Sequence, residues 1–257
     1  MTPSRFARWR AAGAALLALA AAACHHFNAR EFPAPQDLYQ AALRQFRAGN
    51  YEASQTGFQA LTFNVSASDT LYPLARFYLG ESYFGEEDYV TAARELRRVA
   101  DESPTSAIAP DALLRAADAE AAQWTKPPLD PTNGQTALAT YQELQGRFPE
   151  SRAARIASVR IRALNERFAT KELETALFYF QRGAFDSAIL YFKDLIASYN
   201  ASPLVPDAYV YLVRSYQAIG WKDEQATFCE QLRLYYAPFY RRRPDVQVLC
   251  GDRIARR

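Results

Sequence analysis

The stretch Gly183-Ala184-Phe185-Asp186-Ser187-Ala188-Ile189-Leu190-Tyr191-Phe192 decides the fold. A glycine and an aromatic residue come before a small residue, Ala188, and a bulky residue, Phe192, follows it four positions later. The same motif occurs at Gly49-Asn50-Tyr51, which is followed by Ser54 and Phe58. Since residues four apart lie on one face of a helix, each copy predicts a helix that packs through one small and one bulky side chain.

Further copies of the motif have Ala92, Ala137 and Ala226 at the position of the small residue. From Ser54 onward the small residues follow one another after 38, 45, 51 and 38 positions. A proline stands 12 residues after each of Ala92, Ala137 and Ala226. Self-similarity at such a period is typical of solenoids, in which each helix pair stacks on the next.

Close helix packing explains why the small residues recur. Gly80, Ala92 and Ala188 allow antiparallel helices to approach, and large aromatic side chains fill the space beside them. No run alternates as a strand does. The sequence therefore predicts an all-α fold, a right-handed solenoid of about five tetratricopeptide-like antiparallel helix pairs, at residues 36–64, 70–103, 110–148, 152–199 and 205–236.

The domain organisation follows from these pairs. We expect N-terminal repeats of three pairs over 36–148 and C-terminal repeats of two pairs over 149–238, followed by a basic tail over 239–257. Pro104, Pro149 and Pro203 end helices. Residues 126–134 predict a surface loop, and residues 151–182 predict one very long helix or a helix broken near Ala169-Thr170.

The N-terminus predicts export. Basic residues up to Arg10 precede a 13-residue apolar run, Ala11 to Ala23, which would reach about 20 Å as a helix and so falls short of a membrane's hydrocarbon core of about 30 Å. Residues 1–23 therefore form a signal peptide. The stretch before Cys24 resembles a bacterial lipobox, which implies that Cys24 carries a covalent lipid; an ordinary secretory signal is the alternative. The next residue is His25, where an Asp would, by resemblance to enterobacterial lipoproteins, favour retention in the inner membrane. We therefore expect the outer membrane, with residues 24–35 as an extended tether.

Composition and residue inventory argue against nucleic-acid binding and catalysis. Without Arg5, Arg8 and Arg10 of the signal peptide, the formal charge falls from +2 to −1 and leaves no basic footprint. The histidines are His25 and His26 alone, and no phosphate loop, nucleophile elbow or zinc helix occurs. We expect a protein that is not an enzyme and has no metal or cofactor besides the lipid; a hidden carboxylate glycosidase stays open as an alternative.

The C-terminal residues leave two questions open. Cys229 and Cys250 either form a disulfide in an oxidising compartment, or Cys229 is a small buried hydrophobe while Cys250 is free in a mobile tail. The second interpretation is favoured. The tail from Arg241 to Arg257 holds six arginines, which pair with an acidic partner or lipid headgroups, or are simply solvated, as we expect.

Several segments in the central and C-terminal parts of the sequence resemble those of one family. The segments are Leu129-Asp130-Pro131, Ala137 to Leu144, Phe148-Pro149-Glu150-Ser151, Ala169 to Leu173 and Tyr179 to Phe192. Behind a lipobox, this order is similar to that of the BamD family of outer-membrane assembly lipoproteins, over residues 37–238. The resemblance implies a non-catalytic subunit of the machinery that inserts β-barrel proteins. It also implies docking of the C-terminal repeats onto the POTRA domains of the barrel subunit, and contact of the N-terminal repeats with signals of unfolded outer-membrane proteins.

Two rival functions share the predicted fold. One is a periplasmic adaptor that coordinates cell division or cell-wall synthesis, although such proteins carry an N-terminal coiled coil, and residues 25–36 show no heptads. The other is a lipoprotein that activates a cell-wall enzyme, which only the partner would distinguish.

Candidate binding residues follow from the repeat. In a tetratricopeptide superhelix, residues around the small position of each first helix line a groove, which predicts a peptide site at Tyr39, Phe46, Phe77, Glu81 and Phe84. The alternative is burial of these side chains between repeats. On the long helix, the resemblance implies partner docking through Arg160, Arg162, Arg167, Lys171 and Arg182. A solvated charged face would look the same.

Overall fold

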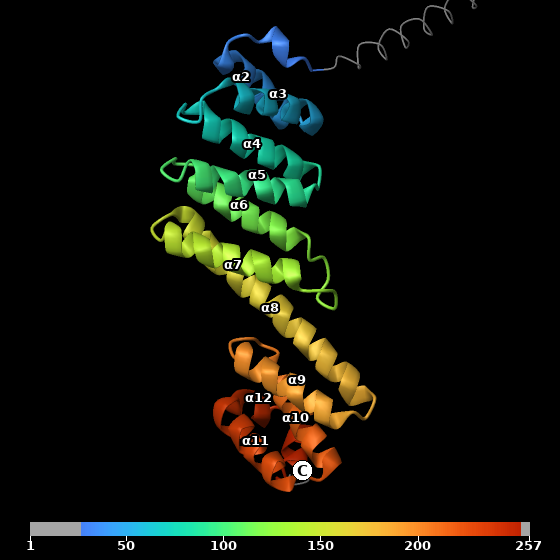
Figure 1. Ribbon diagram of the computed structural model, residues 1–257. Coiled ribbons are helices and arrows are strands. Elements are labelled where there is room, and N and C mark those ends of the chain that lie inside the picture. Colours follow the sequence, from blue (N-terminus) through green and yellow to red (C-terminus); the bar gives the residue numbers. More distant parts are fainter. Residues whose placement is uncertain (1–26, 253–257) are drawn as a thin grey trace, which may run out of the picture. The chain divides into compact units, whose positions relative to one another are not determined.

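The computed structural model describes residues 27–252, which fold into helices joined by short turns, without a strand among them (Figure 1). The predicted all-α fold of tetratricopeptide-like helix pairs is confirmed. The chain divides into two compact units, residues 1–112 and 113–257, and each is described by itself. Cys24, the signal peptide and residues 253–257 lie outside the described residues.

The first unit contains two complete helix pairs, α2 (Pro35–Arg47) with α3 (Tyr51–Asn64) and α4 (Leu71–Gly85) with α5 (Tyr89–Glu102). Gly49 turns the chain between α2 and α3 with a φ of +77°, a backbone region that glycine adopts without strain. Asp88 begins α5, because its side chain accepts a hydrogen bond from the backbone N–H of Thr91 at 3.1 Å. Each pair in Figure 1 is therefore a tight helical hairpin.

Small residues bring the helices of this unit together, as the repeat predicts. A methyl group placed on Gly80 would lie 2.6 Å from Cγ of Leu96, and one on Gly57 would lie 2.6 Å from Cβ of Ala42. Ser54 and Ser82, both fully buried, add a hydrogen bond of 2.7 Å between α3 and α4. The backbones are thus closer than any larger side chain permits.

The segment before α2 differs from the expected tether. Residues Ala29–Glu31 form a 3-10 turn, η1, which Asn28 caps by accepting a hydrogen bond from the Arg30 N–H at 3.1 Å. Phe27 and Phe32 stack with ring centroids 5.8 Å apart and pack against the core formed by α2, α3 and α4. From Phe27 onward the chain is therefore folded onto the first helix pair, because these rings bury apolar surface there.

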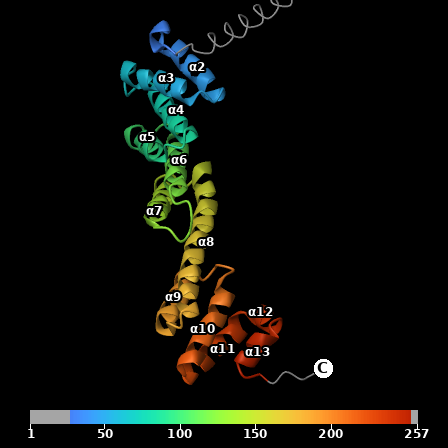
Figure 2. The same ribbon diagram turned by 90° about the vertical axis from the view of Figure 1, so that its right-hand side faces the viewer.

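The boundary between the two units lies within α6 (Ala109–Ala122), and the second unit continues with α7 (Thr132–Arg147), α8 (Arg152–Gln181), α9 (Phe185–Ser198), α10 (Val205–Ile219) and α11 (Lys222–Tyr235). Figure 2 shows α8 as one unbroken rod. It spans 30 residues, and the alternative of a break near Ala169 was wrong, since both Ala169 and Ala176 are buried helix positions. Ser151 caps α8 by accepting from the Ala154 N–H at 3.0 Å.

The last repeat is shifted by one residue from its expected register. Ala226 is exposed, and the buried positions of α11 are Cys229 and Leu232. Counted from the start of each helix, Cys229 takes the place that Phe192 has in α9, and Gln225 takes the place of Ala188. The 12-residue spacing from Ala226 to Pro238 was therefore a coincidence.

The residues after α11 are folded, which corrects both expectations for the C-terminal segment. Cys229 and Cys250 form a disulfide, with their Cα atoms 5.6 Å apart. Two short helices, α12 (Ala237–Arg241) and α13 (Pro244–Leu249), bury Tyr240 and Val246 against the α10 core. The expected solvated tail instead closes the exposed end of the last helix pair, as the end of a solenoid requires.

Candidate protein-binding surfaces

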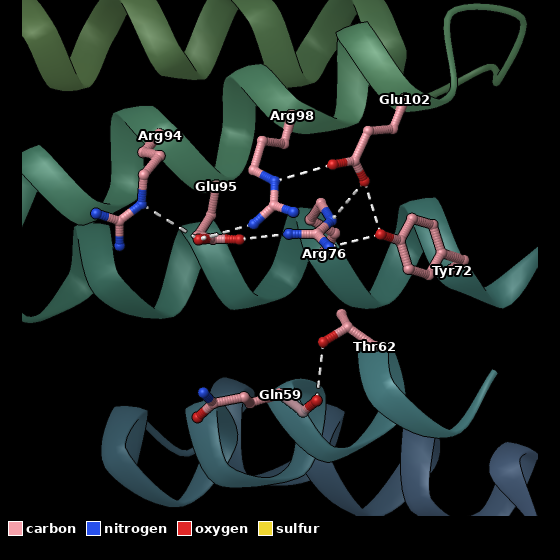
Figure 3. A network of polar contacts seen from close by, with 8 residues as sticks. All are labelled: Gln59, Thr62, Tyr72, Arg76, Arg94, Glu95, Arg98 and Glu102. Carbon is pink, nitrogen blue, oxygen red and sulfur yellow. Dashed lines mark hydrogen bonds and ion pairs between the residues drawn. The ribbon is translucent and has the colours of Figure 1, made fainter. Parts of the chain in front are cut away.

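A buried ionic network fastens α4 to α5 in the first unit (Figure 3). Arg76 and Glu95 are only 6% and 8% exposed, and Nη1 of Arg76 lies 2.6 Å from Oε2 of Glu95. Arg76 Nη2 also donates to the Tyr72 hydroxyl at 2.5 Å, and that hydroxyl donates to Oε2 of Glu102 at 2.6 Å. Removing one member of such a buried pair costs about 3–5 kcal/mol, because the other charge is left uncompensated.

The network ends at the rim of an open cavity of about 440 Å³. The α3–α4 and α5–α6 turns line it with small and hydroxyl-bearing residues, and Glu102 forms part of its wall. Burial alone would raise the pKa of the Glu102 carboxyl, but hydrogen bonds from Tyr72 and Arg98 and the charge of Arg76 outweigh it, and the pKa is lowered. Glu102 is therefore held as a carboxylate whose oxygens are already engaged.

The predicted groove residues of the first unit have different environments. Tyr39 is only 8% exposed, and its ring packs edge-on against Phe58 and Tyr78. Burial is the main reason that the pKa of its hydroxyl is raised. For Tyr39 the structure thus supports burial in the core, the alternative that the sequence left open. It is not part of an open groove.

The other four groove candidates are half-buried. Phe46 packs edge-on against Tyr78 at 5.3 Å, and Phe77 contacts the same ring at 5.4 Å. Phe84 packs against Tyr89 at 5.1 Å, and Glu81 lies on the same helix as Phe77 and Phe84. Each of these side chains keeps an accessible part beside a rigid aromatic core.

Two of the expected docking residues on α8 hold a loop of their own chain. The guanidinium carbon of Arg167 lies 4.5 Å from the ring centroid of Trp124, and Arg167 also donates to the Trp124 carbonyl. Nζ of Lys171 donates to the carbonyl oxygens of Pro128 and Leu129 at 3.2 and 3.1 Å. These contacts fix the 123–131 loop against α8, so Arg167 and Lys171 have structural partners.

Sequence reasoning missed Trp124, the residue at the base of that loop. Its indole is buried, stacks on Phe168 at 4.7 Å and lies so close to Gly134 that a methyl group there would meet Cε3 at 2.4 Å. A tryptophan before a Pro-Pro loop, with a glycine ten residues later, was the signal that was available in the sequence.

The remaining docking candidates differ in their pairing. Arg160 lies 3.3 Å from the Asp118 carboxylate, which also accepts from the Tyr141 hydroxyl at 2.7 Å. Arg162 is exposed and lines an open cavity of about 190 Å³ beside the α9–α10 turn. Arg182 lies over the Phe178 ring, with its guanidinium carbon 3.5 Å from the centroid.

An apolar surface lies on the C-terminal half of α8 and on α9. Phe178 is 48% exposed and Leu190 is 66% exposed, while the rings of Tyr179 and Tyr191 stack at 5.4 Å. Nearby, burial and the charge of Asp194 raise the pKa of Glu172. We call Phe178, Tyr179, Arg182, Leu190 and Tyr191 the α8–α9 surface.

Neither a metal-binding cluster nor a membrane-spanning helix is present in residues 27–252. No group of three or more His, Cys, Asp or Glu side chains is arranged to hold a metal ion in that range. No helix of the same range combines the length and the apolar character needed to cross a membrane.

Comparison with known proteins identifies the family. The profile of the YfiO family, described as an outer membrane lipoprotein, matches residues 33–232. This chain belongs to the YfiO family. The resemblance predicted from the sequence is thereby confirmed.

Two curated relatives of this YfiO-family chain are named outer membrane protein assembly factor BamD. The one from Neisseria meningitidis serogroup A is 31% identical over 91 residues, which are 35% of this chain and 34% of the relative. The one from Caulobacter vibrioides is 31% identical over 88 residues, or 34% of this chain and 29% of the relative. The matched part thus spans about a third of the length of these relatives.

Solved structures show a weaker likeness. The TPR2AB domain of yeast Sti1 is 11% identical, with a TM-score of 0.42 and coverage of 83% of each chain. The Thermus thermophilus repeat protein TTC0263 is 17% identical, with a TM-score of 0.37, over 80% of this chain and 98% of its own.

Proposed function

We propose that this YfiO-family chain is a non-catalytic lipoprotein subunit of the machinery that assembles β-barrel proteins in the outer membrane. The observation that carries the proposal is the family match over residues 33–232, which includes four of the five helix pairs and most of the last. The relatives named assembly factors support it. In this proposal a lipid on Cys24 holds the chain at the periplasmic face of that membrane.

The second unit is the proposed docking site for the POTRA domains of the barrel subunit. Its α8–α9 surface exposes Phe178 and Leu190 beside a half-buried, stacked tyrosine pair. Aromatic residues and arginine are enriched at the cores of protein interfaces, where they supply large contact area with little loss of rotamer freedom. Arg182, already ordered on the Phe178 ring, adds a cation to the same surface.

The first unit is the proposed receiver of substrate signals. Phe77 and Phe84 are half-buried on α4, so they offer ring surface that a peptide with an aromatic end can cover. Tyr78, which stacks on Phe58 at 5.5 Å, packs against Phe77, and Tyr89 packs against Phe84. A rigid platform of this kind lowers the entropy lost on binding an extended segment.

A titration tests the docking site. The detergent-solubilised full-length lipoprotein is titrated with the POTRA region of the barrel subunit from the same cells. We expect Leu190→Ser to weaken binding at least about tenfold, equivalent to about 1.4 kcal/mol. Leu234→Ser, which alters a leucine of similar exposure on α11, is the matched control and should bind like the unaltered protein. Absence of POTRA binding by the unaltered protein would refute the proposed function.

A further inference from the structure

The chain from Phe27 to Phe32 is part of the first helix pair rather than a leash. A methyl group on Gly57 would lie 3.0 and 3.1 Å from Cε1 and Cζ of Phe27, so the ring lies directly on the bare backbone of α3. Phe32 covers the other side of this ring in a stack with an interplanar angle of 14°. The 3-10 turn between them is closed by backbone hydrogen bonds of 3.2 Å from Glu31 to Asn28 and from Phe32 to Ala29. We call Phe27 and Phe32, with the turn between them, the N-terminal staple.

The staple limits how far the helices can lie from a lipid on Cys24. Only three peptide units separate Cys24 from Phe27. A fully extended chain spans at most about 3.3–3.6 Å per residue, so this connection reaches about 10 Å. A helix with its side chains is about 10–12 Å across. An acylated Cys24 whose glyceryl group lies among the headgroups therefore keeps Phe27, and with it the middle of α3 at Gly57, within about one helix diameter of the membrane surface.

We propose that the phospholipid headgroup layer is a binding partner of the first helix pair, and that the N-terminal staple is the mount that presses α2 and α3 against it. The inference rests on the lipid anchor of the proposed function and adds a surface to it. Arg30, exposed at the tip of the staple and without an ion pair among the described residues, is a guanidinium placed for lipid phosphates. An undocked segment would instead give a flexible leash from residue 24 to residue 35, about 40 Å long when extended.

Energy transfer in proteoliposomes tests the mount. The full-length lipoprotein carries Arg44→Cys on α2 as its labelled thiol, since Cys229 and Cys250 are joined to each other, and the acceptor is a headgroup-labelled phospholipid. Two altered forms are compared with this parent. One has 20 Gly and Ser residues inserted between His26 and Phe27, and the other carries Phe27→Ala with Phe32→Ala. Tyr235→Ala, a change of an exposed aromatic residue on α11, is the matched control.

We expect high transfer in the parent and the Tyr235→Ala control, a loss of more than half of it in the insertion form, and a clear loss in the double alanine form. Circular dichroism checks that α2 and α3 persist in every form. Equal transfer in the parent and the insertion form would overturn the mount, and so would a parent that does not float with the liposomes. POTRA binding of the same preparations is a separate readout: its absence refutes the assembly function and leaves the transfer values unchanged.

Discussion

The guanidinium of Arg167 lies over the indole of Trp124, 4.5 Å from the ring centroid, and this pair joins the middle of α8 to the loop that precedes α7. The indole continues into a stack with Phe168 on the same helix. A charged side chain that the family resemblance assigns to a partner therefore has an internal partner. Contacts with α8 therefore help to hold the loop in place.

Arg167→Ala should lower the free energy of unfolding by about 1–3 kcal/mol, because it removes the contact with the indole and the hydrogen bond to the Trp124 carbonyl. Amide hydrogen exchange should rise in residues 123–131. Arg162→Ala, in which an exposed arginine on the same helix is lost, should stay within about 0.5 kcal/mol of the unaltered protein. Equal effects of the two changes on denaturant midpoints would contradict the structural role of Arg167.

Two glycines in helices should respond to alanine with opposite signs. In Gly80→Ala the new methyl group would lie 2.6 Å from Cγ and 3.3 Å from the backbone N of Leu96, so α4 and α5 must move apart. We expect a loss of about 1–3 kcal/mol. Gly146 in α7 has open space at that position, and Gly146→Ala should stabilise by up to about 1 kcal/mol through helix propensity. Thermal unfolding of both variants decides the matter.

Reduction of the Cys229–Cys250 disulfide should loosen α13. The bond closes a loop of sequence separation 21, for which the chain-entropy model gives about 3 kcal/mol. Arg233 and Tyr240 still hold Asp252 after reduction, at 2.6 Å each, so α11 should survive while α13 exchanges its amides faster. Cys250→Ser should reproduce the effect of reductant, and reductant should then have no additional effect. Unchanged amide exchange in α13 would show that the disulfide does not stabilise this helix.

Two carboxylates should make opposite contributions to stability as the pH changes. The Glu102 pKa is lowered from its ordinary 4.5, so its contribution is present above that value and is lost as the pH falls through the folded-state pKa. Glu102→Gln should therefore lower the free energy of unfolding at pH 7, and this loss should shrink in acid.

The Glu172 pKa is raised by burial and by the charge of Asp194, so the charged form of Glu172 destabilises the folded state. Glu172→Gln should raise the free energy of unfolding at pH 7. This gain should vanish below pH 4.5, where Glu172 is neutral in both the folded and the unfolded chain. Denaturant melts at several pH values measure both trends.

The repeat pattern predicted the helices well because each depends on local periodicity and on one small residue. Ala92 with Leu96 and Ala188 with Phe192 are buried, as the motif of a small residue and a bulky one four positions later predicts. The last copy misled, since Ala226 is exposed and Cys229 fills the packing position. At the end of a solenoid no following pair selects the register, and the disulfide and α13 do so instead, through contacts distant in sequence.

The candidate surfaces were harder to predict, because spacing along a helix does not show what covers a side chain. Tyr39 has the position of a groove residue and is nevertheless enclosed by Phe58 and Tyr78. Lys171 has the charge of a docking residue and is used by the carbonyls of Pro128 and Leu129. Both outcomes depend on neighbours that come from other helices or loops.

The proteins that the full-length chain binds in its native cells decide its function. The tagged protein is extracted in detergent from its native cells, with a Cys24→Ser form as control, and the co-purifying proteins are identified by mass spectrometry. Assembly function predicts that a barrel subunit with POTRA domains dominates the eluate and that Leu190→Ser depletes it while Leu234→Ser does not. An eluate dominated by division or cell-wall synthesis proteins, with no barrel subunit, would contradict the assembly function. It would indicate that this fold serves as an adaptor for those proteins.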